Sequence, residues 1–392
     1  MSLPLLALFL AAFAFGTAEF VIAGVLPEVA DGLGITIPTA GFLVTGYAIG
    51  IAIGGPIVAV ATKKISRKAL ILALGAVFTL GQALCALAPS FEWLMLARVI
   101  VSVAHGTYFG IAAVVAFNLV PQDKRGFAVA LILSGLTVSN ILGVPGGTAI
   151  GNAFGWRATF WAVGVLGLVA TLIIAVALPP TAGAATTSGS FRREFKALAR
   201  QQIITSLFIV MLVMIGQYSL FTYIAPLLRE VTGLGANTVP WILLLYGVGA
   251  TIGVFIGGRL ADWRLMPSLI AILCLQAGTY TALFLVAPQP VAMAIMVVFW
   301  GGINFAFGSP VQSRILAWAA DAPNLASSLI PTGFNIGIAI GAVLGGSMVA
   351  SGLGYRALPL IGTVTVIMAT LIAILSHGLE RRAAPEAPII AR

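Results

Sequence analysis

Glu19 is a carboxylate inside an otherwise apolar run, LLALFLAAFAFGTAEFVIAGVLP, near the N-terminus. A charged group in the hydrocarbon region of a membrane costs roughly 2.5–3.5 kcal/mol or more, so it usually faces a wet cavity and has a function. Burial favours the neutral form of a carboxyl group, which lets the group take up and release a proton near neutral pH. We therefore predict that Glu19 is a proton-coupling site. The alternative is a carboxylate that stays paired and clamps two helices together.

His105 and Tyr108 lie on much the same face of a later apolar stretch, 92–119. A histidine titrates near physiological pH, so His105 can relay protons or bind a small molecule. A lone helical histidine also serves as a hydrogen-bonded packing residue, and this alternative stays open. Tyr108 adds a hydroxyl to the same face of the predicted helix.

Neutral polar side chains occur in several other apolar stretches. Together with Glu19, His105 and Tyr108, the predicted substrate-binding residues are Asn140, Gln217, Tyr218, Tyr223, Asn304 and Asn335. A cavity with one acid, neutral amides and aromatic rings suits an amphipathic solute that is uncharged or weakly cationic. Asn and Gln side chains also bridge helices, which is the alternative for each amide.

Long apolar segments must position these residues. Residues of the set AVILMFWYC make up 60% of the 392-residue chain and charged residues only 8%, whereas an ordinary soluble domain is about 25% charged. A membrane-spanning helix needs ~20 apolar residues. The stretches that are long enough are 4–26, 38–62, 69–88, 92–119, 126–150, 156–178, 203–228, 237–260, 267–287, 291–318, 325–350 and 354–377. The composition predicts an all-α polytopic protein with twelve spans in a lipid bilayer.

The 20 basic residues predict the orientation, because positively charged loops stay on the cytoplasmic side. When successive loops are assigned to alternate sides of the membrane, one side carries nearly all of the basic residues, including Arg314. Only Arg157, Arg229 and Arg356 fall on the other side, and Arg98 lies within a span. Both termini are therefore predicted to be cytoplasmic. The positive net charge follows from topology, and the chain has no contiguous soluble basic face for nucleic acid.

An internal repeat divides the chain into two halves. A shift of 199 residues carries Tyr47, Gly50 and Gly54 onto Tyr246, Gly249 and Gly253. Two copies of six spans each have the same orientation, which predicts two six-helix bundles related by a pseudo-twofold axis along the membrane normal. The predicted domains are an N-terminal bundle at 1–178, a basic cytoplasmic linker at 179–202, and a C-terminal bundle with a short tail at 203–392.

Motifs of enzymes and ATP-driven pumps are absent from the sequence. There is no GxxxxGK[ST] loop, no HExxH or GxSxG motif, and no spacing of His, Cys and Asp that resembles a metal site. The chain has only two histidines, and His377 lies at the end of the last stretch. We expect no enzyme activity, no cofactor and no metal ion.

Two connections at corresponding positions of the repeat carry a basic pattern. GGPIVAVATKKISRKAL follows the second stretch and GVFIGGRLADWRLMPSL follows the eighth. Both occupy the place of GxLADRxGRR, the cytoplasmic signature of the major facilitator superfamily. The second copy keeps Gly258 and Asp262, whereas the first has Lys63 in place of the aspartate. The first copy retains Lys64, Arg67 and Lys68.

Further motifs narrow this resemblance. RVIVSVAHG at 98–106 resembles the fourth-helix motif that begins with arginine, and GLTVSNILGVPGGTAIG at 135–151 resembles the fifth-helix antiporter motif. The glycines and proline that carry the second likeness are Gly143, Pro145, Gly146 and Gly147. Over essentially its whole length, the chain resembles the twelve-helix drug:proton antiporter branch of this superfamily. Within that branch it is most similar to bacterial inner-membrane exporters of the arabinose-efflux-like and chloramphenicol-resistance type.

The resemblance implies alternating access, with the first, fourth, seventh and tenth spans lining a cavity. It also implies a role in proton transfer for Arg98, a fixed cation that can act on a nearby carboxyl group; the alternative is an arginine that extends to the membrane interface. We expect a monomeric transporter in the inner membrane that exports a small amphipathic molecule, such as chloramphenicol, in exchange for protons. The alternatives are an exporter of an arabinose-like sugar or another metabolite, an uncoupled facilitator, and a membrane sensor that transports nothing.

Overall fold

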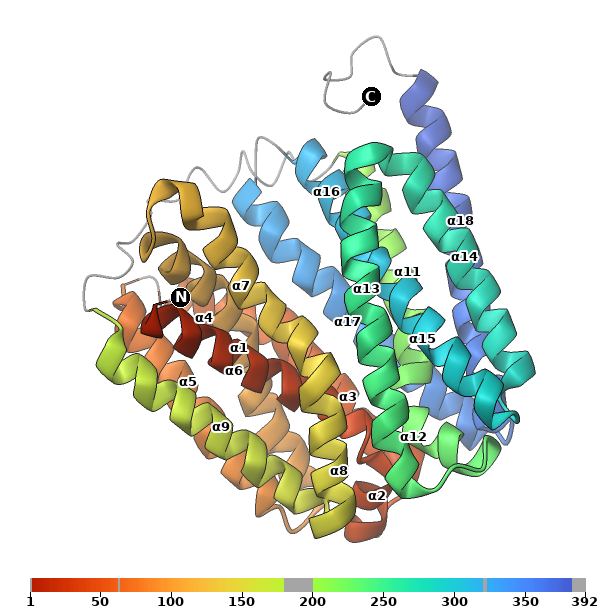
Figure 1. The fold of residues 1–392 in the computed structure, drawn as a ribbon, viewed down its shortest axis with the longest axis horizontal. Helices are drawn as coiled ribbons and strands as arrows, with labels where there is room; N and C mark the ends of the chain where they lie inside the picture. The colour runs from red at the N-terminus through yellow and green to blue at the C-terminus, as the bar shows by residue number, and fades with distance from the viewer. Residues whose placement is uncertain (1, 63, 180–199, 320–322, 383–392) are drawn as a thin grey trace. The chain divides into compact units, whose positions relative to one another are not determined.

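The computed structural model of the chain describes residues 2–62, 64–179, 200–319 and 323–382. Its described residues contain 12 helical spans that are long and apolar enough to cross a membrane (Figure 1). Each span overlaps one of the predicted stretches, from Leu3–Ala23 to Tyr355–Glu380. The predicted all-α fold with twelve spans is confirmed. The orientation of the termini stays a prediction, and the central part of the predicted linker, 180–199, lies outside the described residues.

The chain forms two compact units. Unit 1 comprises Met1–Thr187 and Gly235–Leu244, and unit 2 comprises Ser188–Leu234 and Leu245–Arg392. The domain boundaries expected from the repeat stay a prediction.

Unit 1 is a helix bundle in which the first span packs against two other spans. Its α-helices are α1 (Leu3–Phe20), α2 (Leu26–Leu33), α3 (Ile37–Ile49), α4 (Gly55–Ala61), α5 (Arg67–Ala86), α6 (Phe91–Asn118), α7 (Arg125–Val138), α8 (Val144–Phe154) and α9 (Trp156–Ala177). The 3₁₀ turns are η1 (Val21–Ala23) and η3 (Gln122–Lys124), and the π-turns are η2 (Gly50–Gly54) and η4 (Ser139–Gly143). Helix α1 packs against α7 and α9, and α5 packs against α6 and α9.

Unit 2 contains the second set of spans. Its helices and turns are α11 (Gln201–Phe221), α12 (Ile224–Pro226), the π-turn η5 (Leu227–Val231), α14 (Leu265–Val286), α15 (Pro290–Ala306), α16 (Gly308–Trp318), α17 (Pro323–Ala350), η7 (Tyr355–Ala357) and α18 (Leu358–Arg382). Helix α11 packs against α17 and α18, and α14 packs against α15 and α18. The short η6 (Ala236–Thr238) and the first residues of α13 (Val239–Trp263) are grouped with unit 1, and the rest of α13 belongs to unit 2.

Short polar residues and glycines set the helix ends in unit 1. Ser66 and Ser90 cap α5 and α6, because each side chain accepts a hydrogen bond from a backbone N–H three residues later. Gly155 adopts φ = +85° between α8 and α9, a conformation that favours glycine. Turns of this kind let consecutive spans reverse direction within a few residues.

The fifth span contains a π-turn. Residues Ser139–Gly143 form η4, and Pro145 follows in the first turn of α8, where a proline has no backbone N–H to donate to the preceding turn. The second span has a similar π-turn, η2, at Gly50–Gly54. Such turns inside helices are frequent at functional sites. Both flank the polar cluster described below.

Backbones approach closely where glycines of α13 face α15. A Cβ atom built on Gly253 would lie 2.0 Å from the carbonyl oxygen of Gly302. Small residues of this kind allow helices to pack in a membrane, where no hydrophobic force drives association.

Gly253→Ala is therefore expected to destabilise the packing of α13 on α15. The clash involves backbone atoms, so the helices must separate, at a cost of about 1–3 kcal/mol. Thermal unfolding of the purified protein in detergent measures the effect as a lower midpoint. Gly258→Ala on the same helix is the matched control, because nothing lies within 4 Å of its added Cβ. Equal midpoints for the two variants would contradict the prediction.

Candidate functional site

Glu19 lies in the last turn of α1, immediately before the 3₁₀ turn η1. The glycine-rich fifth span positions this part of α1. Added Cβ atoms on Gly143 and Gly147 would lie 2.0 Å from Thr17 Oγ1 and 2.5 Å from Val21 Cγ2. These contacts fall before and after Glu19 along α1. Side chains at either glycine would therefore displace the carboxylate.

The Glu19 carboxylate faces His105 on α6. The distance from Glu19 Oε2 to His105 Nε2 is 3.7 Å, and the two side chains are only 12% and 5% exposed. On the other side of the ring, Nδ1 of His105 lies 3.0 Å from the hydroxyl of Tyr47. When this hydroxyl donates to Nδ1, a neutral imidazole carries its proton on Nε2, facing Glu19. Three titratable groups thus form a chain from α3 through α6 to α1.

Arg98, on the same helix as His105, brings a buried cation to this cluster. Its side chain is 1% exposed. The guanidinium donates to Leu43 O from Nε at 3.1 Å and to Ala18 O from Nη1 at 3.3 Å, and it lies over the Tyr47 ring. The second terminal nitrogen, Nη2, has no hydrogen-bond partner among the described residues. Ala18 immediately precedes Glu19, so this fixed charge acts directly on the carboxylate.

The four side chains form the ionisable cluster, Glu19, His105, Tyr47 and Arg98. Such a cluster can hold one exchangeable proton between Glu19 and His105, because neither group is paired permanently with Arg98 by a hydrogen bond. The fixed cation offsets the charge of the carboxylate when the proton leaves. This arrangement supports proton uptake and release better than it supports nucleophilic or metal chemistry.

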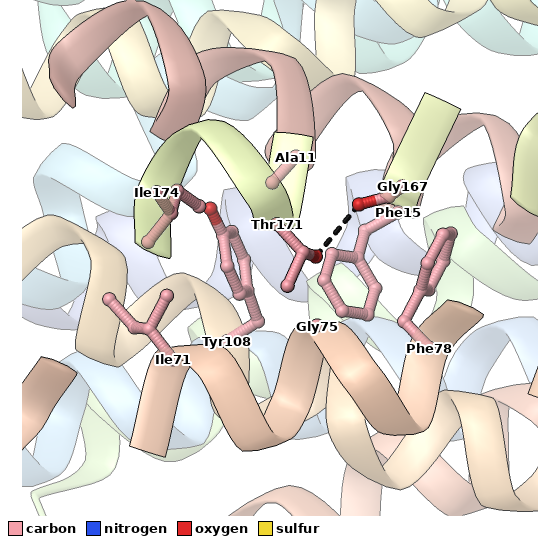
Figure 2. Close-up of a pocket in the computed structure, with 9 residues that line it drawn as sticks. All are labelled: Ala11, Phe15, Ile71, Gly75, Phe78, Tyr108, Gly167, Thr171 and Ile174. Atoms are coloured by element: carbon pink, nitrogen blue, oxygen red, sulfur yellow. Dashed lines mark hydrogen bonds between the residues drawn. The ribbon is translucent and has the colours of Figure 1, made fainter. Parts of the chain in front are cut away.

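Tyr108 lies on α6 but donates its hydroxyl hydrogen bond to Leu8 O at 3.0 Å. It also lines a small cavity between α1, α5, α6 and α9, whose other walls include Phe15, Phe78 and Thr171 (Figure 2). The Thr171 hydroxyl is itself bonded to Gly167 O. The Phe15 ring separates the cavity from His105 by stacking on Tyr108 and contacting the imidazole. The polar groups that line this cavity are thus already bonded to backbone, which is typical of a packing void.

A second polar cluster occurs in unit 2. Gln217 Nε2 on α11 donates to the hydroxyl of Tyr246 on α13 at 3.0 Å. Asn304 on α15 accepts hydrogen bonds at Oδ1 from Gln276 Nε2 and from the hydroxyl of Tyr280, both on α14. Two of the predicted substrate-binding residues, Gln217 and Asn304, thus join the same buried region of unit 2.

The remaining predicted binding residues lie outside the two clusters or on their edge. Tyr223 donates to Ala342 O at 2.9 Å. Asn140 and Asn335 each donate to a carbonyl of the preceding helical turn, Leu136 O and Pro331 O. The ring of Tyr218 contacts Phe221 at the edge of the unit 2 cluster.

The signature residues lie at the ends of spans. Lys68 donates to Leu178 O at 2.5 Å, which joins the start of α5 to the residue after α9. Asp262 is exposed near the end of α13, and Gly258 has open space beside it. Lys64 and Arg67 lie between α4 and the first turn of α5. Gly146 faces open space on α8, in contrast to the tightly packed Gly143 and Gly147.

Four residues of these clusters were not predicted as site residues: Tyr47, Tyr246, Gln276 and Tyr280. Tyr47 and Tyr246 entered the sequence analysis only as matching positions of the repeat, which carries no information about their hydrogen-bond partners. Gln276 lies in the ninth span, which is not among the spans expected to line the cavity. Its pairing with Asn304 is visible only in three dimensions.

Comparisons with known proteins agree with the fold. Residues 8–323 match the family model of the Major Facilitator Superfamily. The chain is 38% identical to the inner membrane transport protein YdhP of Escherichia coli (strain K12), with 95% of each chain covered. It is also 38% identical to a chloramphenicol resistance protein of Streptomyces lividans, covering 87% of this chain and 88% of that one.

A solved structure shows the same architecture. A bacterial homolog of the human lysosomal transporter Spinster, in an inward-facing and unoccupied conformation, matches with a TM-score of 0.80 and 20% sequence identity. The match covers 95% of this chain and 96% of that one, and it concerns the fold alone. With the family model and the two relatives, these findings show that the chain belongs to the major facilitator superfamily, as a multi-pass transporter of the inner membrane and not an enzyme.

Proposed function

We propose that this protein exports small amphipathic molecules in exchange for protons, with Glu19 as the proton site. The observation that carries the proposal is the buried contact of 3.7 Å between Glu19 Oε2 and His105 Nε2. A carboxylate at this depth is costly, and such residues usually pair with a nearby group and mark proton or substrate paths.

The proposed cycle follows from the charges of the ionisable cluster. When Glu19 is deprotonated, its charge is offset by Arg98, and the carboxylate is attracted to α6. Uptake of a proton cancels this attraction and leaves the Arg98 charge uncompensated. Because α6 carries both Arg98 and His105, the proton thus changes the force between α1 and α6. A conformational equilibrium responds to such a difference when its two states bind the proton unequally.

The proposed substrate class has two supports. A relative that is 38% identical over most of both chains is a chloramphenicol resistance protein. The polar groups that are buried in unit 2 are neutral amides and hydroxyls among aromatic rings, which suits an amphipathic solute. One elementary charge that crosses about 100 mV releases roughly 2.3 kcal/mol, enough to concentrate a neutral solute about fiftyfold.

Transport in proteoliposomes with an acidic lumen tests the proposal. The wild-type protein is expected to accumulate chloramphenicol in the lumen against its concentration gradient, and nigericin, which collapses the pH gradient, is expected to abolish accumulation. Equal flux with and without the pH gradient would overturn proton coupling and leave a facilitator. Accumulation of L-arabinose but not chloramphenicol would identify a sugar exporter instead. Absence of flux for both would contradict the proposed substrate class.

A further inference from the structure

A small cavity of unit 1 lies beside the ionisable cluster. Its walls come from α1, α5, α6 and α9 and include the side chains of Tyr108 and Thr171 (Figure 2). Both hydroxyls donate to backbone carbonyls, so a water molecule in the cavity would find few polar partners. Protein interiors are close-packed, and atoms that line a void lose contacts. The cavity therefore lowers the stability of unit 1.

Small residues create this space. The cavity is lined by Ala11 of α1 and Gly167 of α9, among others. The shift of 199 residues carries Ala11 onto Val210 and Gly167 onto Val366. Both valines are fully buried in unit 2. The helix bundle therefore accepts larger side chains at these two positions, and the cavity of unit 1 is not imposed by the fold.

Helix α1 has no such space where it packs against the fifth span. A Cβ atom built on Gly135 would lie 2.7 Å from Ala12 Cβ, and one built on Gly16 would lie 2.6 Å from Ser139 Oγ. Contacts as close as these prevent α1 from moving further toward the fifth span. The cavity offers α1 room in another direction, toward α5, α6 and α9.

Phe15 of α1 connects the cavity to the ionisable cluster. Its ring is 1% exposed, forms part of the cavity wall and stacks on Tyr108 (Figure 2). The centroid of the Phe15 ring lies 5.4 Å from that of the His105 ring. Glu19 follows Phe15 by four residues, so the two side chains project from much the same face of α1. Because Phe15 lies between His105 and the cavity, a ring that leaves the imidazole enters the cavity.

We propose that this cavity is room for the Phe15 ring, which moves into it when α1 shifts relative to α6. While Glu19 is charged, its attraction to α6 keeps the ring against His105. When Glu19 takes up a proton, this attraction ends, and the ring enters the cavity without any expansion of the bundle. The cavity is thus a conformational device that eases the movement of α1. The link to Glu19 rests on the proposed function, whereas the two positions of the ring do not.

Fluorine NMR of one labelled ring tests the two positions without any substrate. Phe15 is replaced by 4-fluorophenylalanine in the full-length protein, purified in detergent. We expect two resonances, or one averaged resonance, with the cavity position more populated at acid pH. Ala11→Val introduces the side chain that Val210 has in unit 2 and is expected to remove the cavity position. A single resonance that ignores pH would overturn the proposal, and so would a pH response that Ala11→Val leaves intact.

Substrate exchange tests the device in the transport cycle. Ala11→Val is expected to slow the exchange of labelled for unlabelled chloramphenicol at least about tenfold, because the bundle must then expand for α1 to move. Its thermal unfolding midpoint is expected to stay the same or rise, since a filled cavity regains contacts. Ala175→Val, at an exposed alanine of α9, is the matched control and is expected to change neither quantity. A raised midpoint with normal exchange in Ala11→Val would show an ordinary packing void and overturn the proposal.

A second variant and the pattern of outcomes keep this inference distinct from the proposed function. Thr171→Ile fills the cavity from α9, with the same expected effects, and replaces Ala11→Val if that variant is unstable. Two ring positions whose populations ignore both pH and Glu19→Gln would support the cavity as room for Phe15 and contradict proton coupling through Glu19. Normal gradient-driven accumulation and normal exchange in both cavity-filling variants would overturn the device and leave the proposed function intact.

Discussion

Glu19→Gln is expected to abolish accumulation of chloramphenicol driven by a pH gradient. The glutamine keeps the size and a hydrogen bond toward His105 but cannot exchange a proton. The ratio of inside to outside solute is then expected to fall to about one, because no proton moves to transfer the energy of the gradient. The measurement is uptake into proteoliposomes with an acidic lumen, compared with the wild-type protein.

Substrate exchange provides the internal control for this variant. Exchange of labelled for unlabelled solute needs the conformational cycle but no net proton movement, so Glu19→Gln is expected to retain it. The part of the pH dependence of exchange that comes from the Glu19 carboxyl group is expected to disappear as well, because the variant removes that group. Glu92→Gln is the matched control, since Glu92 is an exposed acid at the start of α6. Gradient-driven accumulation that survives in Glu19→Gln would demote Glu19 to a structural or binding residue.

The fold was largely predictable because it depends on composition. Each span is a continuous apolar segment, and hydropathy alone locates it to within about four residues of its observed ends, except for the seventh span, which ends at Phe221 and not at 228. The irregular geometry inside the spans was harder to predict. Glycines and Pro145 in the fifth span were compatible with either a bend or close packing, and the π-turn at Ser139–Gly143 packs against α1. No local sequence rule specifies that packing.

The site was predicted as single residues and not as a cluster. Glu19 and His105 stood out because ionisable side chains are rare in apolar runs. Their contact, and the position of Tyr47 on the far side of the imidazole, depend on helix rotation and register. Tyr108 and Tyr223 looked equally suitable by position, yet each donates to a backbone carbonyl. Whether a tyrosine hydroxyl faces a ligand or a neighbouring helix is decided by tertiary packing alone.

Arg314 shows the limit of an argument from charge distribution. It was counted with the loop cations, but the structure buries it completely within α16. Its Nη2 donates to Glu380 Oε1 at 2.6 Å and to Ser376 Oγ at 2.5 Å, both on α18. The Ser376 hydroxyl also lies 3.2 Å from Thr205 Oγ1 on α11. A buried ion pair of this kind links three helices of unit 2.

Glu380→Gln is expected to destabilise the protein strongly, because it leaves the Arg314 charge buried without an anion. Breaking one partner of a buried ion pair costs about 3–5 kcal/mol. The Glu380 side chain is 16% exposed, so solvent screens part of the interaction and the lower end, about 3 kcal/mol, is expected. Thermal unfolding of the purified variant measures this loss against the wild-type protein.

The double variant Arg314→Met/Glu380→Gln distinguishes an uncompensated charge from lost packing. With both charges removed, the desolvation cost of the guanidinium disappears, and methionine fills most of its volume. The double variant is therefore expected to be more stable than Glu380→Gln alone, with a coupling energy of about 1–3 kcal/mol between the two sites. Additive effects would show that the two side chains act independently and that α16 and α18 are held together by apolar packing. A coupling of the expected size would show instead that Glu380 stabilises the protein mainly by compensating the buried charge of Arg314.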